Sequence, residues 1–118
     1  MNAVIRFPDS RSKAPALHFT RIELNRLLNL YTRRVMTGEW RDYAISFGPG
    51  MASFLIFRTS LENPLYVISK LDVRARNNRA RQGQYLVTSR QQRLSQSNSL
   101  EDALAVFDRP LRLISGPP

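Results

Sequence analysis

Seven basic side chains lie between residues 70 and 93, where one acid, Asp72, offsets them. Seven positive charges less one negative charge give +6, out of a net charge of +9 for the whole chain. Arginine forms paired hydrogen bonds with phosphate and carboxylate groups, so the stretch predicts a contact surface for an anionic partner. The basic residues in question are Lys70, Arg74, Arg76, Arg79, Arg81, Arg90 and Arg93.

The densest part of this stretch, residues 74–81, lacks the apolar spacing of either a helix or a strand. We interpret it as a basic loop between two strands. Three roles fit such a loop: charge for solubility, contact with nucleic-acid phosphates, and contact with an acidic protein partner. Tyr66 and Tyr85 lie on the strands that flank the loop, so they are the aromatic residues that could stack on bases if exposed.

Other chemistry finds little support in the sequence. There is no cysteine and one histidine, His18, so neither a metal site nor a cofactor is expected. The motif Gly48-Pro49-Gly50 leads into an expected strand instead of a helix, so we interpret it as a hairpin turn and not as a phosphate loop. Glu39 and Asp42 are the only candidate acidic pair, and ion pairing at a connection explains them better than catalysis does. We therefore expect a binding protein, not an enzyme.

The elements that position the basic stretch follow from hydrophobic periodicity. Apolar residues at three- and four-residue spacing, behind the capping-box sequence Thr20-Arg21-Ile22-Glu23, predict an amphipathic helix over residues 21–37. Alternating or continuous apolar runs then predict strands over residues 43–47, 51–58, 65–70 and 84–89, with a short fifth strand over 92–96. A second helix opens at Ser99 and ends near Pro110, and residues 111–114 could add an edge strand.

The expected architecture is one α+β domain of two layers. Its N-terminal helix precedes an antiparallel meander of four to five strands, and a second short helix follows. Residues 1–16 are expected to form a flexible arm, residues 17–114 the domain, and residues 115–118 a frayed tail. The apolar run at 51–58 suggests a central strand covered on both faces. No hydrophobic run of membrane-spanning length and no secretory signal is evident, which suits a cytoplasmic protein.

Two stretches, residues 21–31 and residues 38–45, resemble a small alphaproteobacterial family known as domain of unknown function 2794. Residues 77–83 and the segment from Val106 to Leu113 add to the resemblance, which covers roughly residues 17–114. Its most specific piece is Gly38-Glu39-Trp40-Arg41-Asp42-Tyr43. The resemblance implies a one-domain bacterial cytoplasmic protein. It implies no activity and no catalytic residue.

Overall fold

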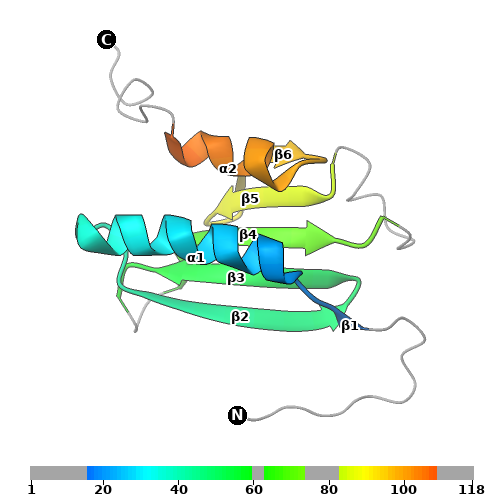
Figure 1. Cartoon of the computed structure of the whole chain (residues 1–118), viewed down its shortest axis with the longest axis horizontal. Coiled ribbons are helices and arrows are strands. Elements are labelled where there is room, and N and C mark those ends of the chain that lie inside the picture. Colours follow the sequence, from blue (N-terminus) through cyan, green and yellow to red (C-terminus); the bar gives the residue numbers. More distant parts are fainter. Residues whose placement is uncertain (1–15, 60–62, 74–82, 109–118) are drawn as a thin grey trace.

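A computed structural model describes residues 16–59, 63–73 and 83–108 (Figure 1). Two helices accompany a six-stranded antiparallel sheet whose strands follow the chain order. The helices are α1 (Arg21–Met36) and α2 (Leu100–Asp108), and the strands are β1 (Ala16–Leu17), β2 (Asp42–Pro49), β3 (Met51–Phe57), β4 (Tyr66–Leu71), β5 (Tyr85–Ser89) and β6 (Gln92–Ser97). The predicted α+β class is confirmed, as are both helices and the antiparallel meander.

The prediction of four to five strands is wrong by one or two. The additional strand is β1, where Ala16 and Leu17 pair with Pro49 and Gly48. Two residues are too few to show the alternating pattern that predicts a strand. Only their pairing with β2 identifies β1. Residue 16, which was assigned to the arm, therefore belongs to the sheet. The rest of the expected arm, the suggested strand at 111–114 and the tail lie outside the described residues.

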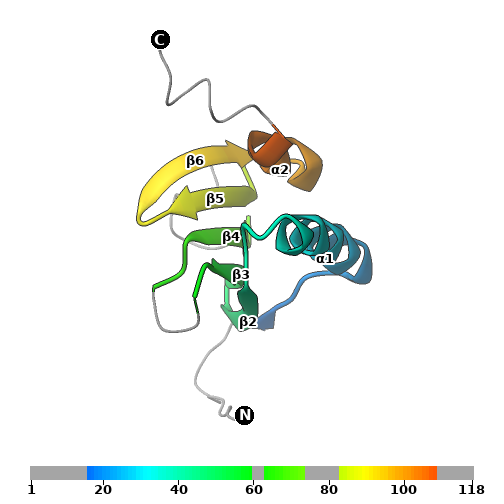
Figure 2. The same ribbon diagram turned by 90° about the vertical axis from the view of Figure 1, so that its left-hand side faces the viewer.

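Both helices lie on the same face of the sheet (Figure 2). The side chains of that face form the core, since Phe54, Ile56, Ile68 and Val87 have no exposed surface and pack with Leu27 of α1. Burying each such side chain contributes about 1.5–3 kcal/mol. The helical layer is incomplete, because Tyr43 and Phe47 on the same face of β2 stay 39% and 48% exposed. The simple two-layer description therefore holds for the centre of the sheet better than for its β2 edge.

Helix α1 begins and ends as its sequence predicts. The backbone amide of Glu23 donates to Thr20 Oγ1 (3.1 Å) and the amide of Thr20 donates to Glu23 Oε1 (2.7 Å), which completes the capping box. Thr37 is the C-terminal cap, and Gly38 follows with φ of +80°. A helix that stops here delivers Trp40 into the core, where it contacts Phe107 of α2 at 5.4 Å between ring centroids.

The sheet face opposite the helices has no described helix over it (Figure 2). Strand β3 is central, as predicted, but helices cover only one of its faces. Met51, Leu55 and Phe57, which alternate with the buried core residues, remain partly exposed on the other side. A run of apolar residues in a central strand cannot by itself reveal whether the second face is covered.

Candidate functional site

Four of the predicted contact residues, Arg74, Arg76, Arg79 and Arg81, lie outside the described residues. The structure describes the residues on either side of the basic segment, residues 74–82, at the end of β4 and just before β5. The amide of Leu71 at the end of β4 donates to the carbonyl of Gln84 (2.7 Å). The side-chain amide of Gln96 donates to the carbonyl of Gly83 (2.9 Å). Residues 74–82 therefore join two strand ends that backbone and side-chain hydrogen bonds hold together.

Gly83 is the residue at which the chain returns to the sheet. Its φ is +143°, a conformation that favours glycine. A Cβ placed on Gly83 would lie 2.5–2.7 Å from backbone atoms of Ser97. The chain after the basic segment thus presses directly against β6, and only glycine allows that approach.

Lys70 does not join a surface of basic residues. Its side chain points to the helix face of the sheet, where Nζ lies 2.9 Å from Glu23 Oε1 and 3.0 Å from the carbonyl oxygen of His18. Lys70 is 8% exposed. Its position within an alternating strand, on the same face as Ile68, could have suggested burial, but its partner Glu23 is 47 residues away in the sequence. The expectation that Lys70 extends the contact surface is therefore corrected.

Tyr85 completes the buried cluster. Its hydroxyl donates to Glu23 Oε2, and burial together with the Glu23 carboxylate raises the pKa of Tyr85 to about 12. Burial alone would raise the pKa of Glu23. Hydrogen bonds from Tyr85, the Thr20 backbone and Lys70, with the charge of Lys70, lower it instead. Every strong partner in the cluster is a protein group, so the arrangement fastens α1 to β4 and β5.

Neither tyrosine beside the basic segment is placed to stack on a base. Tyr85 is buried in the cluster just described. Tyr66 faces the helices and packs edge-on against Phe107, with 5.0 Å between ring centroids, and near Trp40. Tyr66 and Tyr85 are therefore not available on the sheet surface for stacking on nucleic-acid bases.

The basic residues Arg90 and Arg93 lie on the β5–β6 hairpin. Arg90 forms the turn after the end of β5, whereas residues 74–82 precede its beginning. A strand rises about 3.3 Å per residue, so the five residues of β5 separate Arg90 from Gln84, at the other end of the strand, by roughly 17 Å. Arg93 lies on β6 opposite Thr88, and its guanidinium donates to Gln96 Oε1 (3.3 Å).

Glu39 and Asp42 also have separate, local partners. Glu39 accepts hydrogen bonds from Thr37 and Arg34, each 2.8 Å, which lower its pKa. Asp42 Oδ1 accepts from the amide of Tyr43 (2.8 Å). Neither acid lines the groove described next or the smaller cleft between α1 and α2. Within the described ranges, no three His, Cys, Asp or Glu residues gather as a metal site.

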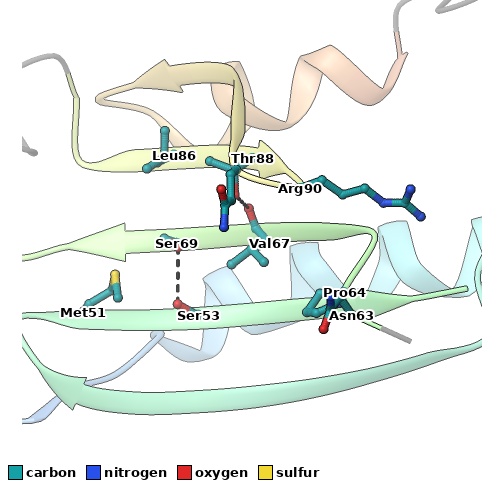
Figure 3. Close-up of a pocket in the computed structure, with 10 residues that line it drawn as sticks. Met51, Ser53, Asn63, Pro64, Val67, Ser69, Leu86, Thr88 and Arg90 are labelled. Carbon is teal, nitrogen blue, oxygen red and sulfur yellow. Dashed lines mark hydrogen bonds between the residues drawn. The ribbon is translucent and has the colours of Figure 1, made fainter. Parts of the chain in front are cut away.

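A groove of about 910 Å³ lies on the sheet face opposite the helices (Figure 3). Its floor comes from alternate residues of three adjacent strands, among them Ser53, Val67, Ser69 and Leu86. At one end lie Asn63 and Pro64 and, across from them, Arg90. In Figure 2 the tip of the β5–β6 hairpin projects away from the helices, toward the side of the sheet on which the groove lies. Groove volumes of this size accommodate small organic ligands.

The groove was not predicted from the sequence. Its floor residues come from three strands that extend over more than thirty positions of the sequence, and each is a short polar or aliphatic residue of an ordinary strand pattern. One local signal was available, namely the turn at Arg90-Gln91, where a two-residue hairpin normally prefers asparagine and glycine. That departure becomes meaningful only when the turn is seen to border a cavity.

Fold and site together define a small α+β protein with one helix-covered and one grooved sheet face. The chain belongs to the family described as protein of unknown function (DUF2794), whose model matches residues 17–104. The comparison with curated proteins gave no match, and neither did the comparison with solved structures. Across the parts of the chain that the structure describes, neither helix has the length and apolarity needed to cross a membrane.

Proposed function

We propose that this protein is a nucleic-acid-associated binding protein that contacts phosphates through Arg74, Arg76, Arg79 and Arg81. The partition of charge carries the proposal. The described ranges hold nine Lys and Arg residues and seven Asp and Glu residues, which gives 9 − 7 = +2. The whole chain carries +9, so +7 belongs to the remaining residues. Residues 74–82 alone supply +4 of that charge.

Such a distribution suits a nearly neutral folded body that presents a concentrated cationic segment. Four arginines within eight residues concentrate positive charge along the chain, which suits contact with successive phosphates of a nucleic-acid strand. Because Tyr66 and Tyr85, on the flanking strands, pack on the helix face, we expect these arginines to contact the nucleic-acid backbone more than the bases. We therefore expect binding with weak sequence preference.

Fluorescence anisotropy with labelled single- and double-stranded DNA and RNA tests this proposal. Neutralising four phosphates predicts a log–log salt slope of about −3 to −4, hence roughly a hundredfold loss of affinity for a fourfold rise in salt. The variant with Arg74, Arg76, Arg79 and Arg81 changed to Gln should lose most of this binding and the slope. A matched control changes four exposed arginines of the described body to Gln, with the same loss of charge: Arg21, Arg33, Arg41 and Arg58.

Equal weakening by the two quadruple variants would mean that net charge alone attracts the probe, and the proposal would fail. A second candidate is an interaction module for an acidic protein, which would use the same arginines as bidentate partners of carboxylates. The exposed apolar residues Met36 (81%) and Phe47 (48%) favour this candidate, because protein partners commonly cover such side chains. If this candidate is correct, the variant that lacks the arginines of residues 74–81 should lose its binding to an acidic protein. Its binding to nucleic acid should not change.

A further inference from the structure

The middle of the groove holds two serine hydroxyls that are hydrogen-bonded to each other. Ser53 and Ser69 lie on adjacent strands and share a hydrogen bond of 3.3 Å between their hydroxyl oxygens (Figure 3). Both serines are less than 10% exposed. Val67 and Leu86 flank them with aliphatic surface. One hydroxyl donates to the other, and the aliphatic surface of Val67 and Leu86 beside them suits this part of the floor to the apolar body of a ligand.

One end of the groove has the opposite character. Arg90, Gln91 and Asn63 gather there, and within the described ranges their side chains make no hydrogen bond or ion pair. Arg90 is the only charged residue among the described residues that line the groove. A guanidinium offers paired donors that match one carboxylate. The groove thus has a cationic side chain at one end, next to a floor of serine and threonine hydroxyls and aliphatic side chains.

The turn that carries Arg90 has an unusual backbone. Ser89 pairs with Gln92, so Arg90 and Gln91 form a two-residue hairpin loop, and their φ angles are +52° and +73°. Hairpins of this kind normally place asparagine and glycine at these positions, because other residues are disfavoured there. Disfavoured conformations concentrate at ligand sites, where side-chain chemistry outweighs backbone preference. Here the two residues that depart from the preference both line the groove.

The length of the groove follows from the register. Met51 lies four residues before Leu55, and Leu55 is level with Val67 and Thr88 across the sheet. At about 3.3 Å per residue, this distance is roughly 13 Å, and Arg90 lies two residues further along β5. The floor, whose aliphatic part is Val67 and Leu86, is therefore much longer than a carboxylate and its first few carbon atoms.

We propose that the groove binds an amphiphilic monocarboxylate, an organic acid whose carboxylate pairs with Arg90 and whose elongated apolar body lies over Val67 and Leu86. This proposal is independent of the nucleic-acid proposal, since it concerns the opposite end of β5 and involves none of the arginines of residues 74–81.

Decanoate is a suitable probe, used below its micelle concentration with the full-length protein. Two-dimensional amide NMR should show saturable shifts at Val67, Ser69, Thr88 and Arg90, and none on the helix face. Decanol keeps the body without the charge, and propionate keeps the charge without the body. Both should bind at least tenfold more weakly than decanoate.

Two variants locate the interactions. Arg90→Gln removes the cation and should weaken decanoate at least tenfold while leaving decanol binding unchanged; Arg33→Gln on α1 serves as the matched control. Val67→Phe fills the floor without touching the turn, so it tests the site even if Arg90→Gln disturbs the hairpin. Shifts that map to Tyr43 and Phe47 on the helix face, or equal decanoate affinity in wild type and both groove variants, would overturn the proposal.

Discussion

The ammonium group of Lys70 lies 2.9 Å from the carboxylate of Glu23, and both side chains are about nine-tenths buried. The two residues come from β4 and from the first turn of α1. Tyr85 of β5 donates to the second carboxylate oxygen. One buried acid therefore caps a helix through Thr20 and joins that helix to two strands of the sheet.

Removal of Lys70 should be among the most destabilising single changes in the described part of the chain. Lys70→Met leaves the Glu23 carboxylate buried without its cation, so we expect a loss of about 3–5 kcal/mol in the free energy of unfolding. Urea denaturation measures it. The double variant Glu23→Gln/Lys70→Met should lose less than the sum of the two single changes, because the second change removes a charge that is already unpaired. Additive losses would show that the pair is not coupled.

The ionisation of Tyr85 should make the free energy of unfolding depend on pH in the alkaline range. Its pKa rises from 10.0 to about 12 on folding, so its contribution is full below pH 10 and is lost as the pH rises toward 12. Glu23 has the opposite sign. Its folded pKa is below 4.5, so its contribution is present above that pH and is lost as the pH falls through the folded pKa.

Tyr85→Phe separates these two effects. Without the tyrosine hydroxyl, stability should fall less between pH 10 and pH 12 than in the wild type. The Glu23 carboxylate also loses a hydrogen bond that lowers its pKa, so the acid unfolding midpoint should move to higher pH. Thermal unfolding across the pH range tests both shifts. An unchanged midpoint in acid would contradict the role given to the hydroxyl.

Gly83 and Gly38 allow backbone conformation to be distinguished from crowding. Both have positive φ, but a Cβ on Gly38 would meet nothing within 4 Å, whereas a Cβ on Gly83 would collide with Ser97. Gly38→Ala should cost about 1–2 kcal/mol from conformation alone. Gly83→Ala should cost clearly more, because β6 must also move away. Equal losses by calorimetry would remove the argument that close approach demands this glycine.

The Arg90-Gln91 turn should trade stability against binding. Replacement by Asn-Gly relieves two disfavoured conformations, so we expect the free energy of unfolding to rise by about 1–3 kcal/mol. The same change removes the cation from the groove and should weaken decanoate at least tenfold. Chemical denaturation and the NMR titration give the two results on one protein sample. Loss of stability would show that the turn is held by contacts that only Arg90 or Gln91 can make.

Local patterns were enough to determine the elements. Helix α1, with its Thr20–Glu23 cap and its stop before Gly38, is a property of sixteen residues and their neighbours. Strands β2 to β6 likewise follow from short runs whose apolar residues alternate or cluster. The antiparallel order follows because short connections leave little choice of partner. The two residues of β1 were missed since their pairing depends wholly on β2.

Only the tertiary structure decided what the charged and polar residues do. Composition alone cannot distinguish Lys70 from the arginines that follow it. In the fold its side chain points to the helix face, where Glu23 and the His18 carbonyl bind its ammonium group. Arg90 belongs to the basic stretch in sequence, but β5 carries it to the end of that strand opposite Gly83, where it borders the groove. The groove arises from residues of three strands that share one face, and a side chain's face and neighbours depend on register and packing, which no single segment contains.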